Sequence, residues 1–205
     1  MLELRNVNET DLSPLYAISL ATGHAGGDAS HLYQQGRLIG EIYSAPYAIL
    51  APEFTIVAED SAGVAGYIVG APDTVAWEAQ LERDWWPRLR KLYPDPGQAP
   101  LSSWNADQRR CHMIHRPLST PRELADAYPG HLHMNLLPRL QGQGVGPRML
   151  SAWLARAAAL DVRSVHIGVN RNNPRGASFW AKQGFNDLPL PGAPARTRWM
   201  GVRIA

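Results

Sequence analysis

The chain has only one cysteine, Cys111, among its 205 residues, so no disulfide can form within it. It also has no apolar stretch near the roughly 20 residues that a membrane-spanning helix needs. The first twenty residues lack the basic start and the apolar centre of a signal peptide. These absences predict a cytoplasmic protein that does not cross a membrane.

Charge of either sign is also sparse. Lys and Arg contribute 20 residues and Asp and Glu 18, which gives a formal net charge of +2. The basic residues lie mainly in segments 83–91, 109–122 and 139–175 and form no continuous run. We therefore expect no nucleic-acid partner, whereas the small positive excess suits a phosphorylated ligand.

Length and composition favour one domain over residues 1–205. The hydrophobic fraction of 45% is enough for one buried core, and the length slightly exceeds that of a simple domain. We therefore expect an insertion within one domain rather than a second core. The sequence contains no internal repeat and no low-complexity tract.

Strand and helix patterns alternate along the chain. A strand pattern at 2–7 precedes a helix capped by Asn8 or Thr10, which continues to Leu20, and a second helical pattern covers 32–43. Strands 54–58 and 64–69 form a predicted hairpin. The later elements are a strand at 132–137, a helix at 145–160, a strand at 165–169, a helix at 174–183 and a strand at 197–204. This order predicts an α/β fold, with a mixed sheet and helices on both faces.

A glycine-rich turn lies in segment 136–147, Leu-Leu-Pro-Arg-Leu-Gln-Gly-Gln-Gly-Val-Gly-Pro. Gly142, Gly144 and Gly146 let successive N–H groups point at one anion, and the following helix adds the positive end of its dipole. Pro147 stands where the dinucleotide-binding fingerprint G-x-G-x-x-G needs its last glycine, and the Lys-Ser/Thr of a P-loop is missing. The segment therefore predicts a phosphate cradle of another kind.

The spacing Gln141-x-x-Gly144-x-Gly146 resembles the pyrophosphate loop of the GNAT superfamily of acyl-CoA N-acyltransferases. A second match follows at Asn173-Pro-Arg-Gly-Ala-Ser-Phe-Trp-Ala-Lys-Gln-Gly-Phe, which is similar to the N-x-x-A-x-x-x-Y-x-x-x-G-F segment of that superfamily. Two positions differ. Gly176 replaces the usual alanine, and Trp180 replaces the tyrosine often proposed as general acid.

The resemblance implies a largely antiparallel central sheet in which strands 132–137 and 165–169 splay apart. The pantetheine arm of acetyl-CoA is expected in this gap, with a backbone N–H near Leu136 facing the thioester oxygen. The implied cofactor-binding residues are Asn135, Leu136, Leu137, Gln141, Gly142, Gln143, Gly144, Val145, Gly146, Arg148, Asn173, Phe179 and Trp180. Asn173 also suits a helix N-cap before Pro174.

The catalytic residues that we expect are Asp73, His133 and Leu136, the last through its backbone. An amine must lose a proton during attack, so Asp73 after the hairpin or His133 on strand 132–137 is the candidate general base. Each has an ordinary alternative role, since Asp73 suits a helix cap and a strand histidine is often structural. Without the usual tyrosine, a water, Tyr67 or Tyr128 remains to protonate the thiolate.

Segment 74–125 is a predicted helical and loop insertion between strands 64–69 and 132–137. Trp77, Leu81, Trp85 and Leu89 recur every four residues, and Pro87 should kink or restart this helix. Prolines then favour loops near 94–100 and 117–121. The insertion either roofs the acceptor pocket or is a structural flap anchored by tryptophans.

Histidines and the cysteine gather in Cys111-His112-x-x-His115 and in His131-x-His133. Neither segment has the spaced second pair of ligands that standard zinc sites use. We therefore expect no bound metal.

Within the superfamily, segment 47–74 also resembles the acetyltransferase-like C-terminal domain of O-GlcNAc hydrolases, through Pro52-Glu53-Phe54 and Gly66-Tyr67-Ile68-Val69-Gly70. The resemblance implies an acetyl-CoA-dependent N-acetyltransferase acting on an amine. The alternative is a catalytically inactive acyl-CoA-binding domain, and a less favoured one is hydroxyl acylation or thioester hydrolysis. The sequence indicates neither the acceptor nor the oligomeric state.

Overall fold

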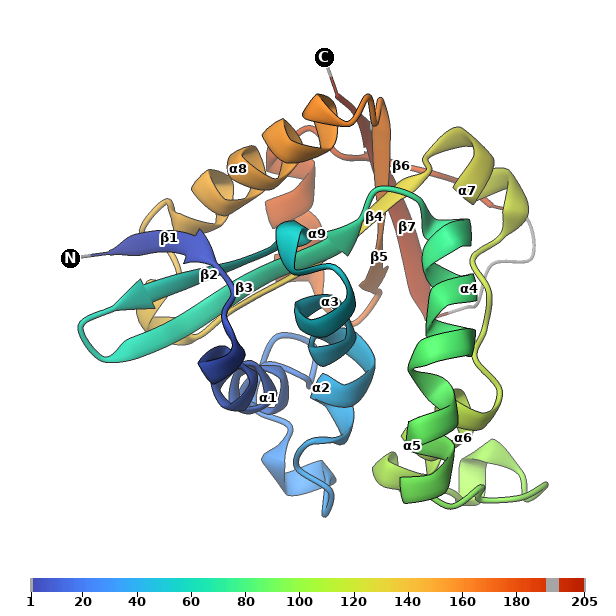
Figure 1. Cartoon of the computed structure of the whole chain (residues 1–205). Coiled ribbons are helices and arrows are strands. Elements are labelled where there is room, and N and C mark those ends of the chain that lie inside the picture. The colour runs from blue at the N-terminus through green and yellow to red at the C-terminus, as the bar shows by residue number, and fades with distance from the viewer. Residues whose placement is uncertain (1, 191–195, 205) are drawn as a thin grey trace.

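The computed structural model describes residues 2–190 and 196–204. Within them, seven strands form one sheet in the order β1-β2-β3-β4-β5-β7-β6 (Figure 1). The strands are β1 (Glu3–Asn6), β2 (Thr55–Asp60), β3 (Gly63–Ala71), β4 (Gly130–Leu136), β5 (Ser164–Asn170), β6 (Asn186–Asp187) and β7 (Thr197–Arg203). Neighbouring strands are antiparallel except β4 and β5, which are parallel. The predicted α/β fold with a mixed, largely antiparallel sheet is confirmed.

The helices lie on both faces of this sheet. They are α1 (Leu12–Ala21), α2 (Leu38–Tyr43), α3 (Ala45–Leu50), α4 (Thr74–Asp84), α5 (Trp86–Leu92), α6 (Ala106–His115), α7 (Arg122–Ala127), α8 (Val145–Ala159) and α9 (Pro174–Lys182). Short 3-10 helices lie at Glu9–Asp11, Ser30–Leu32, Pro52–Phe54, Leu101–Ser103 and Pro138–Leu140. In Figure 1, α8 lies above the sheet and α1 to α3 lie below it. No helix in the described ranges combines the length and apolarity needed to cross a bilayer.

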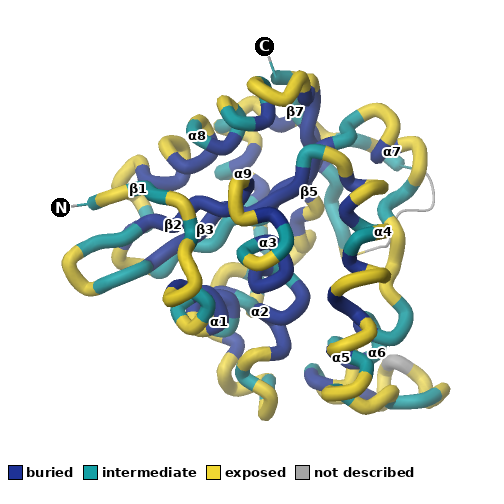
Figure 2. The backbone as a smooth tube through the Cα atoms, in the orientation of Figure 1, coloured by how far each residue is buried: buried dark blue, intermediate teal, exposed yellow. Residues whose placement is uncertain are grey.

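Two side chains show how the faces of the sheet are covered. The Tyr67 hydroxyl of β3 lies 3.0 Å from Ser19 Oγ of α1. On the other face, the Trp153 indole of α8 donates a 3.0 Å hydrogen bond to the Phe54 carbonyl. Both rings are almost fully buried, and the dark central strands of Figure 2 lie between these two helical layers. The core therefore follows the strand alternation expected for a sheet covered on both sides.

Strands β4 and β5 pair over only two residues. Gly130 lies opposite Val165 and His131 opposite His166, and no pairing of these strands is recorded beyond His131 within the described chain. Strand β4 continues to Leu136 beside β3, while β5 continues to Asn170 beside β7. The predicted splay is confirmed, and it leaves one backbone edge of each strand without a strand partner.

The second predicted helix, at 32–43, is shorter than expected because α2 starts only at Leu38. The N–H groups of Gln34 and Gln35 donate to the Asp107 carboxylate, at 2.9 and 3.0 Å. Asp107 lies on α6, far away in the sequence. A long-range contact therefore holds these residues in a turn where the local pattern favoured a helix.

The insertion is helical at first, as predicted. Trp77, Leu81, Trp85 and Leu89 are buried, and the helix restarts at Trp86, just before Pro87. Helices α6 and α7 were not predicted. A capping box does mark the start of α6, since the Asn105 side chain accepts from Gln108 N–H and the Gln108 side chain accepts from Asn105 N–H.

The junction between the first two helices of the insertion, and the second of these helices, contact α2. The Trp85 indole donates a 2.8 Å hydrogen bond to the Glu41 carbonyl, and Arg88 Nη2 lies 2.9 Å from Glu41 Oε2. The Glu41 side chain is 4% exposed, whereas that of Arg88 is 49% exposed. A nearly buried carboxylate thus depends on a cation from the insertion.

Replacing Arg88 by methionine should lower the free energy of unfolding by about 2 kcal/mol, because it leaves the Glu41 carboxylate buried and unpaired. The control is Arg83→Met, whose partner Asp84 is on the surface and whose loss should cost under about 0.5 kcal/mol. Chemical denaturation at neutral pH measures both variants. If Arg88→Met and Arg83→Met had equal free energies of unfolding, the pair between Arg88 and Glu41 would not anchor the insertion.

Candidate functional site

The glycine-rich turn has the backbone conformation that a cradle needs. Gly142 and Gly144 have positive φ angles of 74° and 73°, which residues with a Cβ atom rarely adopt. A Cβ atom added at either residue would meet nothing within 4 Å. The space in front of this turn is therefore open, and strain as well as bulk would oppose any other residue there.

Unused donors face this open space. Gly144 is the N-cap of α8 and offers no side-chain cap. None of the N–H groups from Gly142 to Gly146 forms a recorded hydrogen bond with another described residue. Together with the positive end of the fifteen-residue helix α8, they form a site for a phosphate or pyrophosphate group.

The side chains of the turn hold its shape. Gln141 Nε2 donates to the Leu136 carbonyl at 2.7 Å, and Gln143 Nε2 donates to the Arg139 carbonyl at 2.6 Å. A Cβ atom at Gly146 would lie 3.0 Å from the Phe179 ring, so this glycine allows close packing of α8 against α9. Of the predicted cofactor residues, Gln141 and Gly146 thus have a clear structural role in placing the turn.

The end of β4 presents one backbone residue to the gap. Leu137 N–H donates to Ala65 O at 2.8 Å, so it is already used by β3. Because alternate residues of a strand direct their N–H and C=O groups to opposite edges, the N–H of Leu136 points away from β3 and toward the β4–β5 gap. Among Asn135, Leu136 and Leu137, the geometry therefore favours Leu136 as the backbone donor.

Helix α9 borders the same gap. The Asn173 carboxamide accepts from Gly176 N–H at 2.8 Å, which makes it the N-cap of α9. Trp180 is 8% exposed and packs between the rings of Phe179 and Phe185, each with a centroid 5.0 Å away. The indole thus fills an aromatic cluster at the position where the superfamily usually has tyrosine.

Three histidines lie on one face of β4 and β5. The ring centroid of His131 is 6.1 Å from that of His133 and 5.9 Å from that of His166. The Thr74 hydroxyl donates to the Pro129 carbonyl, so His131 Nδ1–H must donate to Thr74 Oγ1, at 2.8 Å. His131 Nε2 then accepts from the Tyr47 hydroxyl at 2.8 Å. His131 is thus a neutral structural residue, and burial lowers its pKa well below the usual value.

His133 differs from its neighbours because no hydrogen bond to its ring is recorded among the described residues. Its ring lies edge-on to Tyr43 and Tyr47, with centroids 5.7 and 5.8 Å away. Burial, and then the charge of His166, lower the pKa of His133 to about 4. At neutral pH it is an uncharged imidazole with a nitrogen lone pair that no recorded hydrogen bond uses.

The other predicted base, Asp73, occupies a different position. Its side chain is exposed and accepts a 2.9 Å hydrogen bond from Ala76 N–H, as the N-cap of α4. Asn135, on the same strand face as His133, donates from Nδ2 to Thr22 Oγ1 at 2.6 Å. The structure thus gives Asp73 its ordinary alternative role and joins Asn135 to the end of α1.

Tyr67 is poorly placed to give up a proton. Its hydroxyl is buried beside Ser19, which also contacts Ser44 at 2.8 Å. Burial raises the pKa of Tyr67 to about 12. The hydroxyl therefore stays protonated inside the core.

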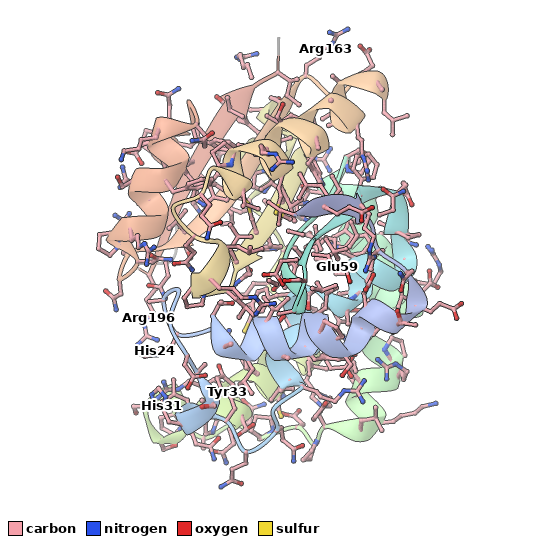
Figure 3. All side chains as sticks on the ribbon, turned by 90° about the vertical axis from the view of Figure 1, so that its left-hand side faces the viewer. His24, His31, Tyr33, Glu59, Arg163 and Arg196 are labelled. Carbon is pink, nitrogen blue, oxygen red and sulfur yellow. The ribbon has the colours of Figure 1, made fainter. Side chains whose placement is uncertain are left out.

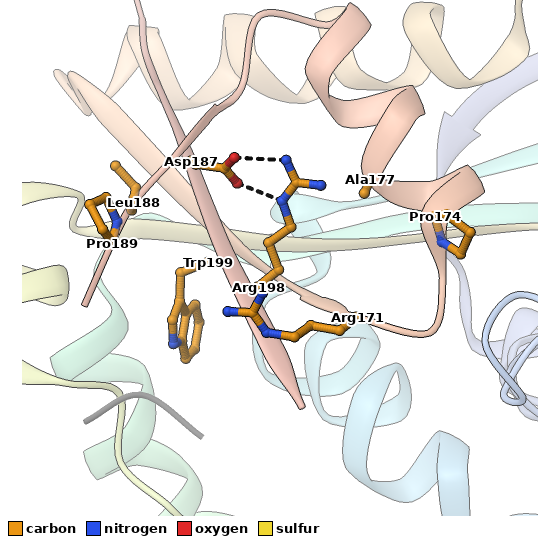
Figure 4. Close-up of a pocket in the computed structure, with 8 residues that line it drawn as sticks. All are labelled: Arg171, Pro174, Ala177, Asp187, Leu188, Pro189, Arg198 and Trp199. Atoms are coloured by element: carbon orange, nitrogen blue, oxygen red, sulfur yellow. Dashed lines mark hydrogen bonds and ion pairs between the residues drawn. The ribbon is translucent and has the colours of Figure 1, made fainter. Parts of the chain in front are cut away.

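A separate pocket of about 490 Å³ lies between α9 and strands β6 and β7 (Figure 4). Its lining includes Arg171, Trp199 and the ion pair between Arg198 and Asp187 (2.5 Å). None of the site residues predicted from the sequence lines it. This pocket is therefore a different place from the cradle at the end of β4.

Known structures share this fold. SsHAT is 30% identical in sequence, with a TM-score of 0.89 over 100% of this chain and 98% of that one. The chain belongs to the GNAT superfamily. No family model matches the sequence.

More distant GNAT structures share the fold. The ribosomal-protein-alanine N-acetyltransferase of Brucella melitensis is 16% identical, with a TM-score of 0.56 over 98% of this chain and 99% of that one. The protein yncA of Salmonella typhimurium, solved with its cofactor acetyl-CoA, is 15% identical, with a TM-score of 0.53 over 100% and 94%. At these identities the comparison establishes the fold alone.

The GNAT pattern located the turn and the polar face of β4, but it missed several of their neighbours. Tyr47 and Thr74 fix His131, and Tyr43 flanks His133. These contacts join residues far apart in the chain, so no local spacing signals them. The period of two in His131-x-His133 was the one usable sign that both rings share a face.

The neutral histidines make stability depend on pH. The folded pKa of His133 is about 4 and the unfolded value is about 6.5, so between these values the unfolded chain binds more protons. Stability is fully present above about pH 6.5 and is lost as the pH falls toward 4. Going from about pH 7 to about pH 5 should cost on the order of 2 kcal/mol through His133.

His133→Gln should flatten this dependence, because glutamine does not titrate. The control is His31→Gln, which removes an exposed histidine and should leave the dependence unchanged. Denaturant titrations at several pH values give the slopes. Parallel curves for wild type and His133→Gln would contradict the assignment.

Proposed function

We propose that the protein transfers an acetyl group from acetyl-CoA to an amine. The observation that carries the proposal is the open cradle of unused N–H groups, placed directly after a β4 edge that β5 leaves unpaired. The cradle suits the pyrophosphate and the free edge suits the amide-containing arm of the cofactor.

The turn from Gly142 to Gly146 would hold the pyrophosphate, with Gln141 and Gln143 keeping its shape. Exposed Arg148, in the first turn of α8, is placed to pair with a phosphate. The N–H of Leu136 would bind the arm, because its carbonyl already accepts from Gln141, and Asn173 and Phe179 border it. We also propose that these parts act within one domain, as composition suggested, and in the cytoplasm.

Acetyl-CoA supplies an activated acyl group: the amine nitrogen bonds to the thioester carbon, the C–S bond breaks, and the thiolate leaves while the nitrogen loses a proton. The N–H of Leu136 would donate to the carbonyl oxygen as it gains negative charge. A backbone donor needs no particular side chain, which is consistent with leucine at this position.

His133 is our choice of general base. It is neutral at physiological pH, its ring forms no hydrogen bond with any residue that the structure describes, and it shares a strand with Leu136. A group with so low a pKa is a weak base at neutral pH, so His133 would take the proton only after the nitrogen has bonded to the acyl carbon and become acidic. Asp73 is less suitable because its carboxylate already caps α4.

Trp180 supplies no transferable proton, since the indole N–H is a donor only. A thiol has a reference pKa of about 8.5, so a water can protonate the leaving thiolate. The rival function is an inactive acyl-CoA-binding domain, which the tryptophan and the resemblance to the O-GlcNAc hydrolase appendage favour. It predicts cofactor binding with no turnover for any amine.

Replacing Gly144 by aspartate should abolish acetyl-CoA binding, because the side chain occupies the open space of the cradle and its charge repels phosphate. Gly97→Asp is the matched control: Gly97 also has a positive φ, of 86°, and open surroundings, but lies in the insertion. Both variants bear the same backbone strain. Calorimetric titration should find wild-type affinity in the control only, and binding by folded Gly144→Asp would refute the cradle.

His133→Ala should lower amine-dependent release of CoA about a hundredfold and leave the Kd for acetyl-CoA within about twofold, since a base acts on the acceptor. Asp73→Asn is the comparison variant, because asparagine still caps α4 and removes only the charge. Its rate should fall by less than about threefold. A reversed pattern would make Asp73 the base, and no stimulation by any amine would favour the binding domain.

A further inference from the structure

Arg110 of α6 is a partly buried cation held by neutral groups. Its Nε lies 3.1 Å from the Tyr33 hydroxyl, and its Nη1 lies 2.9 Å from the Tyr43 hydroxyl and 3.0 Å from Met113 Sδ. Its guanidinium carbon also lies 5.2 Å from the centre of the Tyr43 ring. These contacts fix the plane of the guanidinium without neutralising its charge.

No carboxylate in the described part of the chain pairs with Arg110. Asp107, one turn earlier on α6, accepts the N–H groups of Gln34 and Gln35. Glu41 of α2 pairs with Arg88. Asp107 and Glu41, the acids on α6 and α2, therefore bind other groups. Neither forms an ion pair with Arg110, whose guanidinium keeps its positive charge.

Two N–H groups of Arg110 remain unused. A guanidinium has five N–H donors, and three are directed at Tyr33, Tyr43 and Met113. Both hydrogens of Nη2 have no recorded acceptor among the described residues. A charge held away from bulk water in this way is stabilised when a ligand supplies the opposite charge.

Arg110 is connected to the proposed base. Tyr43, which accepts from Arg110, lies edge-on to His133 with centroids 5.7 Å apart. On the other side, Tyr33 reaches the same edge of the molecule as His24, His31 and Arg196 (Figure 3). The residues Tyr33, Arg110, Tyr43 and His133 therefore form a line of contacts from that edge to β4.

The loop between α1 and α2 brings this line close to the gap. A Cβ atom at Gly26 would lie 3.5 Å from Nδ2 of Asn173, the N-cap of α9. The loop that carries His24 therefore touches the helix that borders the cofactor site. Arg110 therefore lies between Tyr33 and Tyr43, the tyrosine that flanks His133.

We propose that Arg110 binds a carboxylate on the acceptor, so that the substrate is an amine carrying a carboxylate several bonds from its nitrogen. This inference rests on the proposed function. A singly charged carboxylate matches the single uncompensated charge, and one of its oxygens can accept from Nη2. Arg110 thereby selects the acceptor, while His133 acts on its nitrogen.

The test uses β-alanine, γ-aminobutyrate and ε-aminocaproate, each paired with its carboxamide. With saturating acetyl-CoA, wild type should show kcat/KM at least about tenfold higher for the acid than for the amide at one or more chain lengths. Arg110→Met should bring this ratio to about one by lowering only the rate with the acid. Arg109→Met, which removes an exposed charge beside it on α6, should leave the ratio unchanged.

A second variant and a second measurement cover the possible failures. Arg110→Lys keeps the charge and should retain part of the preference, so the test does not depend on folding of the methionine variant. Binding of the same compounds to the CoA-loaded protein is followed by the NMR signal of His133. Acid binding that is weakened in Arg110→Lys and lost in Arg110→Met, without turnover in wild type, would reject the transferase and keep the carboxylate site. Turnover without any acid preference would keep the transferase and overturn the role of Arg110.

Discussion

The parting of β4 from β5 is the constraint on which the rest of the site depends. Paired strands satisfy each other's backbone groups, and here the pairing stops after His131 and His166. The N–H and C=O groups beyond it need water or a ligand with amide groups of its own. The glycine turn follows after the short 3-10 helix Pro138–Leu140 and has its own unused donors, so the two segments together can accept an extended arm and a pyrophosphate.

The two faces of the sheet carry different parts of the proposed site at this gap. On one face, α8 and α9 pack closely through Gly146 and Phe179 and hold the phosphate turn. On the other, β4 presents histidines that burial keeps neutral. His131 is held by two hydrogen bonds, whereas the His133 ring has none to the residues that the structure describes. The same strand thus carries a structural imidazole and one that is available for proton transfer, and only their partners distinguish them.

The insertion is more than a flap anchored by tryptophans. Its charged residues form separate contacts with the N-terminal helical layer. Arg88 pairs with Glu41, and Asp107 accepts hydrogen bonds from the turn before α2. Arg110 instead has no acid partner among the described residues, and its charge lies beside Tyr33 and Tyr43, the second of which flanks His133. The insertion therefore both stabilises the first helices and supplies the one cationic group that we assign to the acceptor.

The sequence by itself determined what local spacing controls: the strand and helix order, the left-handed glycines of the turn, and the shared face of His131 and His133. Only the tertiary structure decided what depends on contacts between distant residues. Asp107 shortens the helix at 32–43, and Ala65 O accepts the Leu137 N–H, which therefore does not face the gap. Within the described chain, folding also brings no acid into an ion pair with Arg110. Backbone preference is a property of neighbouring residues, whereas charge pairing and hydrogen-bond supply depend on which segments folding brings together.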